Sequence, residues 1–314
     1  MTRARRSAWI AACLVAAGIS GARAANEGAA FLKLGSGARA AGMGSAFTAA
    51  ADDATSARWN PAGLARMAHR ELSASHTEWI SDLRYDAVTA ALPLTRGDTL
   101  ALGAAYLSQG SLERRDAGGG LQGNFNASDA VASASLGHAF SPRLRAGLTA
   151  KVVEQAIDAD KAKGLAFDAG VQAALSPRLN IGAAAFNLGR DMRFLSNSYH
   201  LPLGFSAGAE FKAAAGLTIS ADLAREVYAG KTSVRVGSEY RVFGGLALRA
   251  GYQASMGQGA VHAPSGDATL GSLNQFTGLG LGLGFRVAAF GVDYAMVPND
   301  QLGATHHFTI SSRF

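Results

Sequence analysis

The chain has 314 residues, of which 39 are glycine, 48% are hydrophobic and 17% are charged. This composition is too apolar for an intrinsically disordered protein. After the first 24 residues, no run of about 18 uninterrupted apolar residues occurs, which argues against a bundle of transmembrane helices.

Residues 1–24 have the features of a secretory signal peptide. Three arginines precede an apolar stretch over Trp9–Ile19, and small residues at Ala22 and Ala24 provide a cleavage site. A lipoprotein leader is the alternative, because Cys13 follows an Ile-Ala-Ala sequence. The apolar run before Cys13 is short and continues past it, which favours cleavage after Ala24. The mature chain then has no cysteine, and therefore no disulfide and no thiolate metal site.

The net charge of +6 belongs mostly to this leader. Its removal takes away four arginines and leaves 25 basic against 23 acidic residues, a net charge of +2. No dense run of Lys and Arg with interleaved aromatic residues occurs elsewhere. Nucleic acid is therefore not a predicted partner.

The next segment, residues 25–70, is rich in glycine around Gly35, Gly37, Gly42 and Gly44. A phosphate-binding loop is one interpretation of these glycines. That loop requires a preceding strand, a following helix in a βαβ unit and a downstream acid, and a P-loop requires Lys followed by Ser or Thr. The segment has neither pattern. We therefore predict that its glycines allow close packing against the rest of the chain.

From residue 71 onward, the hydrophobic pattern has a period of two, which predicts β-strands. Leu203, Phe205 and Ala207, for example, alternate with Gly204 and Ser206. Most of these segments have about 10 to 12 residues, the length that a tilted strand needs to cross a membrane. Fourteen such strands are expected near 71–79, 84–94, 98–108, 129–140, 143–155, 164–175, 178–189, 201–212, 216–227, 231–242, 245–255, 277–286, 288–297 and 305–314.

The expected connections alternate between tight turns and longer loops. The longer ones are residues 109–128, 156–163, 190–200, 256–276 and 298–304. A soluble sandwich shares the strand alternation, but the export signal, the even strand count and the loop asymmetry favour a membrane barrel. A closed sheet also has no edges, which lipid would not tolerate.

We therefore predict an all-β protein, a transmembrane antiparallel β-barrel of about 14 strands with an N-terminal hatch in its lumen. The expected parts are a cleaved signal peptide (1–24), the hatch or plug (25–70) and the barrel (71–314). Export through the Sec pathway would place it in the outer membrane of a Gram-negative-type bacterium, in contact with outer-membrane lipid.

Charged residues on the polar faces of the strands are expected to line the lumen, as a salt-bridge network or as a filter for solutes. The alternating glycines Gly278, Gly280, Gly282 and Gly284 predict a bare stretch of lumen wall. No spacing of histidines suggests a metal, and no Gly-x-Ser-x-Gly elbow occurs, so neither an enzyme nor a cofactor is predicted. The lumen-lining candidates are Arg145, Lys151, Asp168, Glu210, Asp222, Arg235, Glu239, Arg241, Arg249, Arg286 and Asp293.

The sequence FLKLGSGARAAGMGSAFTAAADDATSARWNPAGLA, residues 31–65, resembles the N-terminal signature of the PorV/PorQ family of outer-membrane proteins, which is related to the FadL-type transporters. The resemblance lies in a Gly-x-Arg-Ala-x-Gly-Met-Gly motif, an acidic pair, and an aromatic residue before Asn-Pro-Ala-Gly-Leu. It implies a hatch or gate formed by Gly37, Arg39, Gly42, Gly44, Asp52, Asp53, Asn60, Pro61 and Gly63.

This resemblance implies one of two functions. FadL-type relatives admit hydrophobic molecules passively, which suggests a passive channel for small hydrophobic compounds, gated by the N-terminal segment. PorV-like proteins instead belong to the type IX secretion system, which suggests a non-transporting adaptor with envelope or secretion partners. The chain differs from the fatty-acid transporters in its polar, glycine-rich residues 109–128.

Overall fold

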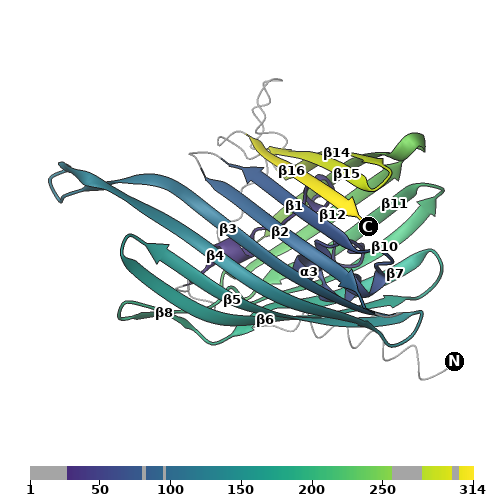
Figure 1. Cartoon of the computed structure of the whole chain (residues 1–314), viewed down its shortest axis with the longest axis horizontal. Helices are drawn as coiled ribbons and strands as arrows, with labels where there is room; N and C mark the ends of the chain where they lie inside the picture. Colours follow the sequence, from purple (N-terminus) through teal and green to yellow (C-terminus); the bar gives the residue numbers. More distant parts are fainter. Residues whose placement is uncertain (1–26, 80–82, 95–96, 257–277, 299–303) are drawn as a thin grey trace.

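The computed structural model describes residues 27–79, 83–94, 97–256, 278–298 and 304–314. Within these ranges, fourteen antiparallel strands close into one barrel (Figure 1), in the order β1-β16-β15-β14-β13-β12-β11-β10-β7-β6-β5-β4-β3-β2. Each expected strand overlaps one of them, so the predicted fold is confirmed. The expected signal peptide lies outside the described residues. The barrel strands are β1 (Glu71–Glu78), β2 (Arg84–Pro93), β3 (Asp98–Arg115), β4 (Leu121–Ala139), β5 (Leu144–Ile157), β6 (Asp160–Ala174), β7 (Leu179–Gly189), β10 (Gly204–Ala214), β11 (Leu217–Glu226), β12 (Lys231–Arg241), β13 (Leu246–Met256), β14 (Leu279–Val287), β15 (Phe290–Pro298) and β16 (Ala304–Arg313).

The barrel turns polar side chains inward and apolar side chains outward. In β1, Glu71, Ser73 and Thr77 are buried whereas Leu72 is exposed. Around the wall, leucine, valine, isoleucine and phenylalanine make up most of the large exposed residues. A soluble protein would bury this face, whereas a transmembrane barrel presents it to lipid.

Two connections differ from the sequence prediction. Residues 109–128 are mostly strand, because β3 and β4 continue as a long hairpin that reaches beyond the other strands in Figure 1. β5 and β6 are joined by only two residues, so the expected loop 156–163 is also a strand extension. The polar composition of these tips suggested loops, but a hairpin outside the membrane also needs polar side chains. Residues 190–203 contain a short hairpin, β8 (Met192–Phe194) and β9 (Asn197–Tyr199).

The chain enters and leaves the barrel at the same end. β1 pairs with β16, and the Phe314 N–H donates to the Arg70 carbonyl. We call this the short-turn end, because the connections β4–β5, β6–β7 and β14–β15 turn there. The opposite, long-loop end carries the β3–β4 tip and the β8–β9 hairpin. A 3₁₀ helix, η3 (Phe243–Gly245), joins β12 to β13 at the short-turn end.

Residues 27–70, the N-terminal segment, lie inside the barrel, and Figure 1 shows α3 enclosed by the strands. The helices are too short to bury a face on their own, and the barrel wall supplies the packing. α2 packs on β13–β16, whereas η2 packs on β3–β6 across the lumen. None of the described helices is long and apolar enough to cross a membrane. The elements are η1 (Ala30–Lys33), α2 (Ala38–Gly42), α3 (Ser56–Trp59) and η2 (Pro61–Arg66).

Candidate functional site

The glycine motif of the N-terminal segment lies backbone to backbone on the barrel wall. A Cβ added to Gly44, whose φ is +58°, would lie 2.5 Å from the Tyr252 nitrogen. From the opposite side, a Cβ added to Gly251 would lie 2.1 Å from the Met43 carbonyl carbon. Gly42 meets Gly282 in the same way. Of the four alternating glycines predicted to leave the wall bare, Gly280 and Gly282 lie against α2, whereas Gly284 is covered by the side chains of Arg249 and Asp293 and Gly278 by the Gln253 carbonyl.

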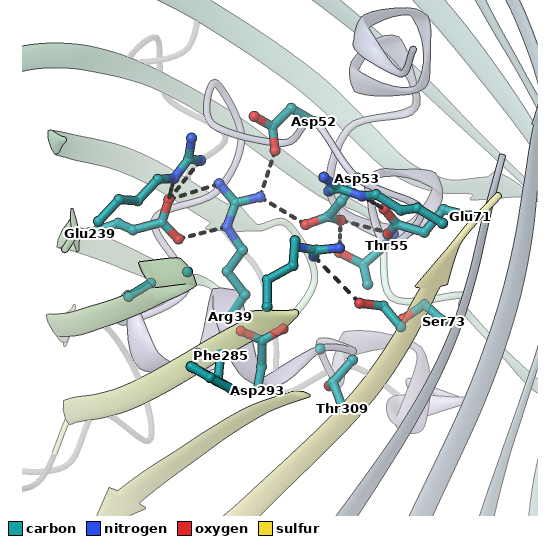
Figure 2. A pocket seen from close by; sticks show the side chains of 18 of the residues that line it. Arg39, Asp52, Asp53, Thr55, Glu71, Ser73, Glu239, Phe285, Asp293 and Thr309 are labelled. Atoms are coloured by element: carbon teal, nitrogen blue, oxygen red, sulfur yellow. Dashed lines mark hydrogen bonds and ion pairs between the residues drawn. The ribbon is translucent and has the colours of Figure 1, made fainter. Parts of the chain in front are cut away.

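Arg39 extends from α2 between a wall carboxylate and two carboxylates of its own segment (Figure 2). Its Nε lies 2.8 Å from Glu239 Oε2, and its Nη1 lies 2.5 Å from Asp52 Oδ1 and 2.9 Å from Asp53 Oδ2. Planar guanidinium donors suit such multiple carboxylate contacts. Arg39 thus links α2 to Asp52 and Asp53 farther along the N-terminal segment, and also to β12 of the barrel wall.

The ion pairs continue along the wall. Arg249 Nε lies 2.8 Å from Glu239 Oε2, and Arg249 Nη1 lies 2.7 Å from Asp293 Oδ1. Arg241 also pairs with Glu239, at 2.9 Å. We call Arg39, Asp52, Asp53, Glu239, Arg249 and Asp293 the Arg39 network. It joins the N-terminal segment to β12, β13 and β15.

Within the Arg39 network, the arginine charges stabilise the ionised form of the neighbouring carboxylates. Burial alone would raise the pKa of Asp52, but the charges of Arg39 and Arg66 outweigh it and lower this pKa to about 2. Asp52 is therefore ionised at neutral pH. Removing one member of a buried ion pair lowers the stability of the fold, because the charge of its partner is left buried without an opposite charge.

Asn60 fastens the other end of the segment. It is fully buried, and its Nδ2 donates to the carbonyls of Thr48, Val171 and Ala183, at 2.8, 3.1 and 3.4 Å. Its Oδ1 accepts from the Ala62 N–H and caps η2. Asn60 therefore joins the start of η2 to β6 and β7 of the wall.

We expect Asn60→Ala to loosen this end of the segment by about 1–3 kcal/mol, because several buried hydrogen bonds are lost together. Hydrogen exchange at the Ala62 amide would measure the local opening free energy. Asn124→Ala is the control, since Asn124 lies exposed on the β3–β4 hairpin. Equal protection of Ala62 in both variants would contradict the anchoring role of Asn60.

The remaining motif residues shape the segment itself. Asp53 accepts from the Thr55 N–H and hydroxyl beside α3. Pro61 begins η2, where no N–H is needed. A Cβ on Gly63 would lie 2.4 Å from the Ala51 carbonyl oxygen, so the backbone of η2 packs directly against the backbone at Ala51.

Asp222 holds the middle of the segment from β11. It accepts the N–H groups of Phe47 and Thr48, both at 2.8 Å, and the Thr48 hydroxyl lies 2.6 Å from Ser206 Oγ. Sequence inspection found Asp222 but missed Gln172, which donates to several carbonyls of the same segment. Gln172 alternates with apolar neighbours, so its inward direction was readable, although its partners were not.

The other lumen-lining candidates fall outside the Arg39 network. Asp168 pairs with Lys151 at 2.6 Å and accepts the Asn187 N–H, where the β6–β7 register shifts. Arg235 lies opposite Asp222 in the β11–β12 register, and no carboxylate lies within ion-pair distance of it among the described residues. Of the further candidates, Glu210 pairs with Arg66, Arg145 donates to the Pro142 carbonyl, and Arg286 lines the cavity at the short-turn end.

Toward the long-loop end, a cluster of apolar residues is buried in the lumen. The buried cluster joins Phe31 and Leu32 of η1 to inward-facing residues of β2–β6, and Met192 and Leu201 cover it from the 190–203 connection. The N-terminal segment is attached here by backbone contacts between Gly28 and His200. Sequence inspection missed this cluster, which consists of Ala29, Phe31, Leu32, Tyr85, Leu107, Val131, Val153, Ala162, Ala166, Met192 and Leu201.

A cavity of about 590 Å³ lies between the N-terminal segment and the short-turn end of the barrel. Among the described residues, its lining includes six arginines and five carboxylates, and all six residues of the Arg39 network border it (Figure 2). An apolar region and a charged cavity thus lie at opposite ends of the lumen, with the N-terminal segment between them.

A family model described as Uncharacterised protein family (UPF0164) matches residues 7–265. The chain belongs to this family. No protein of curated function matches the UPF0164 chain.

Several solved structures share the fold of this UPF0164 chain. The CymD monoaromatic hydrocarbon channel is 13% identical with a TM-score of 0.65, and the match covers 89% of this chain and 98% of that one. The toluene transporter TbuX of Ralstonia pickettii is 14% identical with a TM-score of 0.64 and the same coverage. A FadL homologue of Pseudomonas aeruginosa is 11% identical with a TM-score of 0.57, again over 89% and 98%. The first two are described as a channel and a transporter, and at such identities the likeness shows a FadL-like barrel fold.

Proposed function

We propose that this chain is a passive outer-membrane channel for small hydrophobic compounds, gated by its N-terminal segment. The observation that carries the proposal is the apolar cluster, which lies inside a barrel whose other inward residues are mostly polar. Small-molecule sites are mostly apolar and concave. The fold likeness to a monoaromatic hydrocarbon channel and a toluene transporter supports the same solute class.

The gating part of the proposal rests on how the segment is held. Three of its residues, Ala29, Phe31 and Leu32, complete the apolar cluster, and Arg39 lies at the charged cavity. A solute bound in the cluster would therefore contact the same segment that blocks the axis of the barrel. Displacement of η1 would open the cluster without breaking hydrogen bonds between wall strands.

The proposal also includes the export of the chain and its orientation in the membrane. Residues 1–24 would direct Sec export and be removed, and the short-turn end would face the periplasm, as in other outer-membrane barrels. The long-loop end, with the apolar cluster behind it, would then face outward. The motif of residues 31–65 supports membership of a PorV/PorQ-type group.

A closed lumen favours a second candidate function, that of a non-transporting adaptor for a secretion or surface-assembly machine. The segment spans the lumen from β13–β16 to β3–β6, and the described wall strands pair in a complete ring. A barrel that stays sealed could serve envelope proteins as a scaffold.

Reconstituted liposomes distinguish the two functions. A channel should admit a hydrophobic aromatic probe while excluding sugars in a swelling assay. Val131→Asn places an unpaired amide in the apolar cluster and should slow probe uptake about tenfold, whereas Val131→Ile keeps the site apolar and should not. No uptake by the wild type, together with co-purification of envelope proteins, would contradict the channel and favour the adaptor.

A further inference from the structure

The cavity at the short-turn end contains one arginine that lacks a carboxylate partner. Five of the six arginines in its lining form ion pairs with carboxylates of the protein, namely Arg39, Arg66, Arg241, Arg249 and Arg313. Among the described residues, no carboxylate lies within ion-pair distance of the sixth, Arg286. The lining thus carries one uncompensated positive charge.

The wall around Arg286 leaves room for its guanidinium. Arg286 on β14 is paired with Gly291 on β15, and Gly291 with Ser311 on β16. A Cβ added to Gly291 would lie 3.0 Å from Arg286 Nη2 and 3.1 Å from Cζ, so the guanidinium rests on the bare glycine. A larger residue at position 291 would displace it.

The guanidinium has unused hydrogen-bond donors. Nη2 lies 3.5 Å from Ser311 Oγ, at the limit of a hydrogen bond, and Nη1 is buried with no acceptor among the described residues. Ser73 lies opposite Ser311 in the β1–β16 register and also lines the cavity. A guanidinium beside two hydroxyls is a donor set for an oxyanion.

Nearby carboxylates would not repel such a ligand strongly, because each is already neutralised. Glu71 pairs with Arg313 at 2.7 Å, and Asp293 pairs with Arg249 at 2.7 Å. The cavity volume of about 590 Å³ lies in the range of small-molecule sites. A solute entering from the short-turn end would meet the side chain of Arg286, which lines the cavity and has, among the described residues, no ion pair that must first be broken.

We infer that Arg286, Ser311 and Ser73 form a binding site for the carboxylate or phosphate group of a small soluble anion. The site does not depend on the channel function, because it lies on the opposite side of the N-terminal segment from the apolar cluster. A sealed barrel could equally use it.

Titration calorimetry on the full-length barrel in neutral detergent tests the site, with inorganic phosphate in one arm and succinate in the other. We expect at least one of these anions to bind, and Arg286→Gln to weaken that binding about tenfold or more, because a charged hydrogen-bond donor is lost. The arm that shows binding identifies the headgroup. Ser311→Ala should give a smaller loss in the same arm and provides a second variant if Arg286→Gln does not fold.

Arg145→Gln is the matched control. It removes the same charge from the lumen face near the short-turn end, but Arg145 does not line the cavity and donates to the Pro142 carbonyl. Heat-modifiable migration on gels would verify folding of each variant. Absence of binding by the folded wild type in both arms would overturn the site, as would equal weakening by Arg286→Gln and Arg145→Gln.

Discussion

Deleting residues 31–64 should convert a closed barrel into an open, nonselective pore. The deleted part includes α2, α3 and the first residues of η2, which together connect opposite walls of the lumen. The wall hydrogen bonds join only the strands, so the barrel should still assemble. Single-channel conductance in planar bilayers would measure the change, from no measurable current to a stable open level.

The control for this deletion is Asn60→Ala, which loosens the segment but leaves it in the lumen. Its current should show brief openings at most. Failure of the deletion variant to form a heat-modifiable barrel would contradict the expectation, because it would make the segment a structural part of the wall. A barrel that assembles but stays closed would contradict the gating role.

Replacing Gly251 with valine should expel the segment from the lumen without removing any of it. The first carbon of the new side chain would lie 2.1 Å from the Met43 carbonyl carbon and 2.2 Å from the Gly44 nitrogen. Backbone atoms cannot rotate away from such a contact, so the overlap should cost well above the roughly 1–3 kcal/mol of ordinary overpacking. Valine itself is well suited to a strand, so β13 should persist.

Protease sensitivity of the N-terminal segment in the folded barrel would report its release, together with conductance. Ala250→Val is the matched control, because Ala250 is the neighbouring residue of β13 and faces outward. We expect Ala250→Val to remain closed and protected. A protected segment in Gly251→Val would mean that α2 can rest on the wall in another way.

The strands were predictable because lipid and lumen impose opposite demands on alternate residues. That constraint acts on every membrane-crossing residue, so fourteen segments could be counted from the sequence alone. It does not act beyond the membrane, where a hairpin and a loop have similar polar compositions. The expected loop at 109–128 was wrong for this reason.

The position of the glycine motif against bare wall could also be inferred, whereas its ionic partners could not. Arg39 and Glu239 are separated by 200 positions in the chain, and their contact depends on which strand faces α2. The apolar cluster was invisible for a related reason. Val153 lies two residues after Lys151 and therefore on the same face of its strand, so its inward direction was readable. What the sequence could not show is that Val131 and Val153 meet each other and Phe31 in one cluster.

Closure of the barrel has a consequence for the order of assembly. The ring is completed by β1 and β16, where Glu71 pairs with Arg313 across 242 positions of the chain. A segment that fills the lumen from wall to wall is difficult to thread into a finished cylinder. The strands can instead curl around it while the β1–β16 seam is still open, with α2 resting on β13–β15 before the last strand docks. In that order the N-terminal segment is enclosed as the seam closes and does not have to be inserted into a finished cylinder, whereas the strand pairing of the wall itself does not require it.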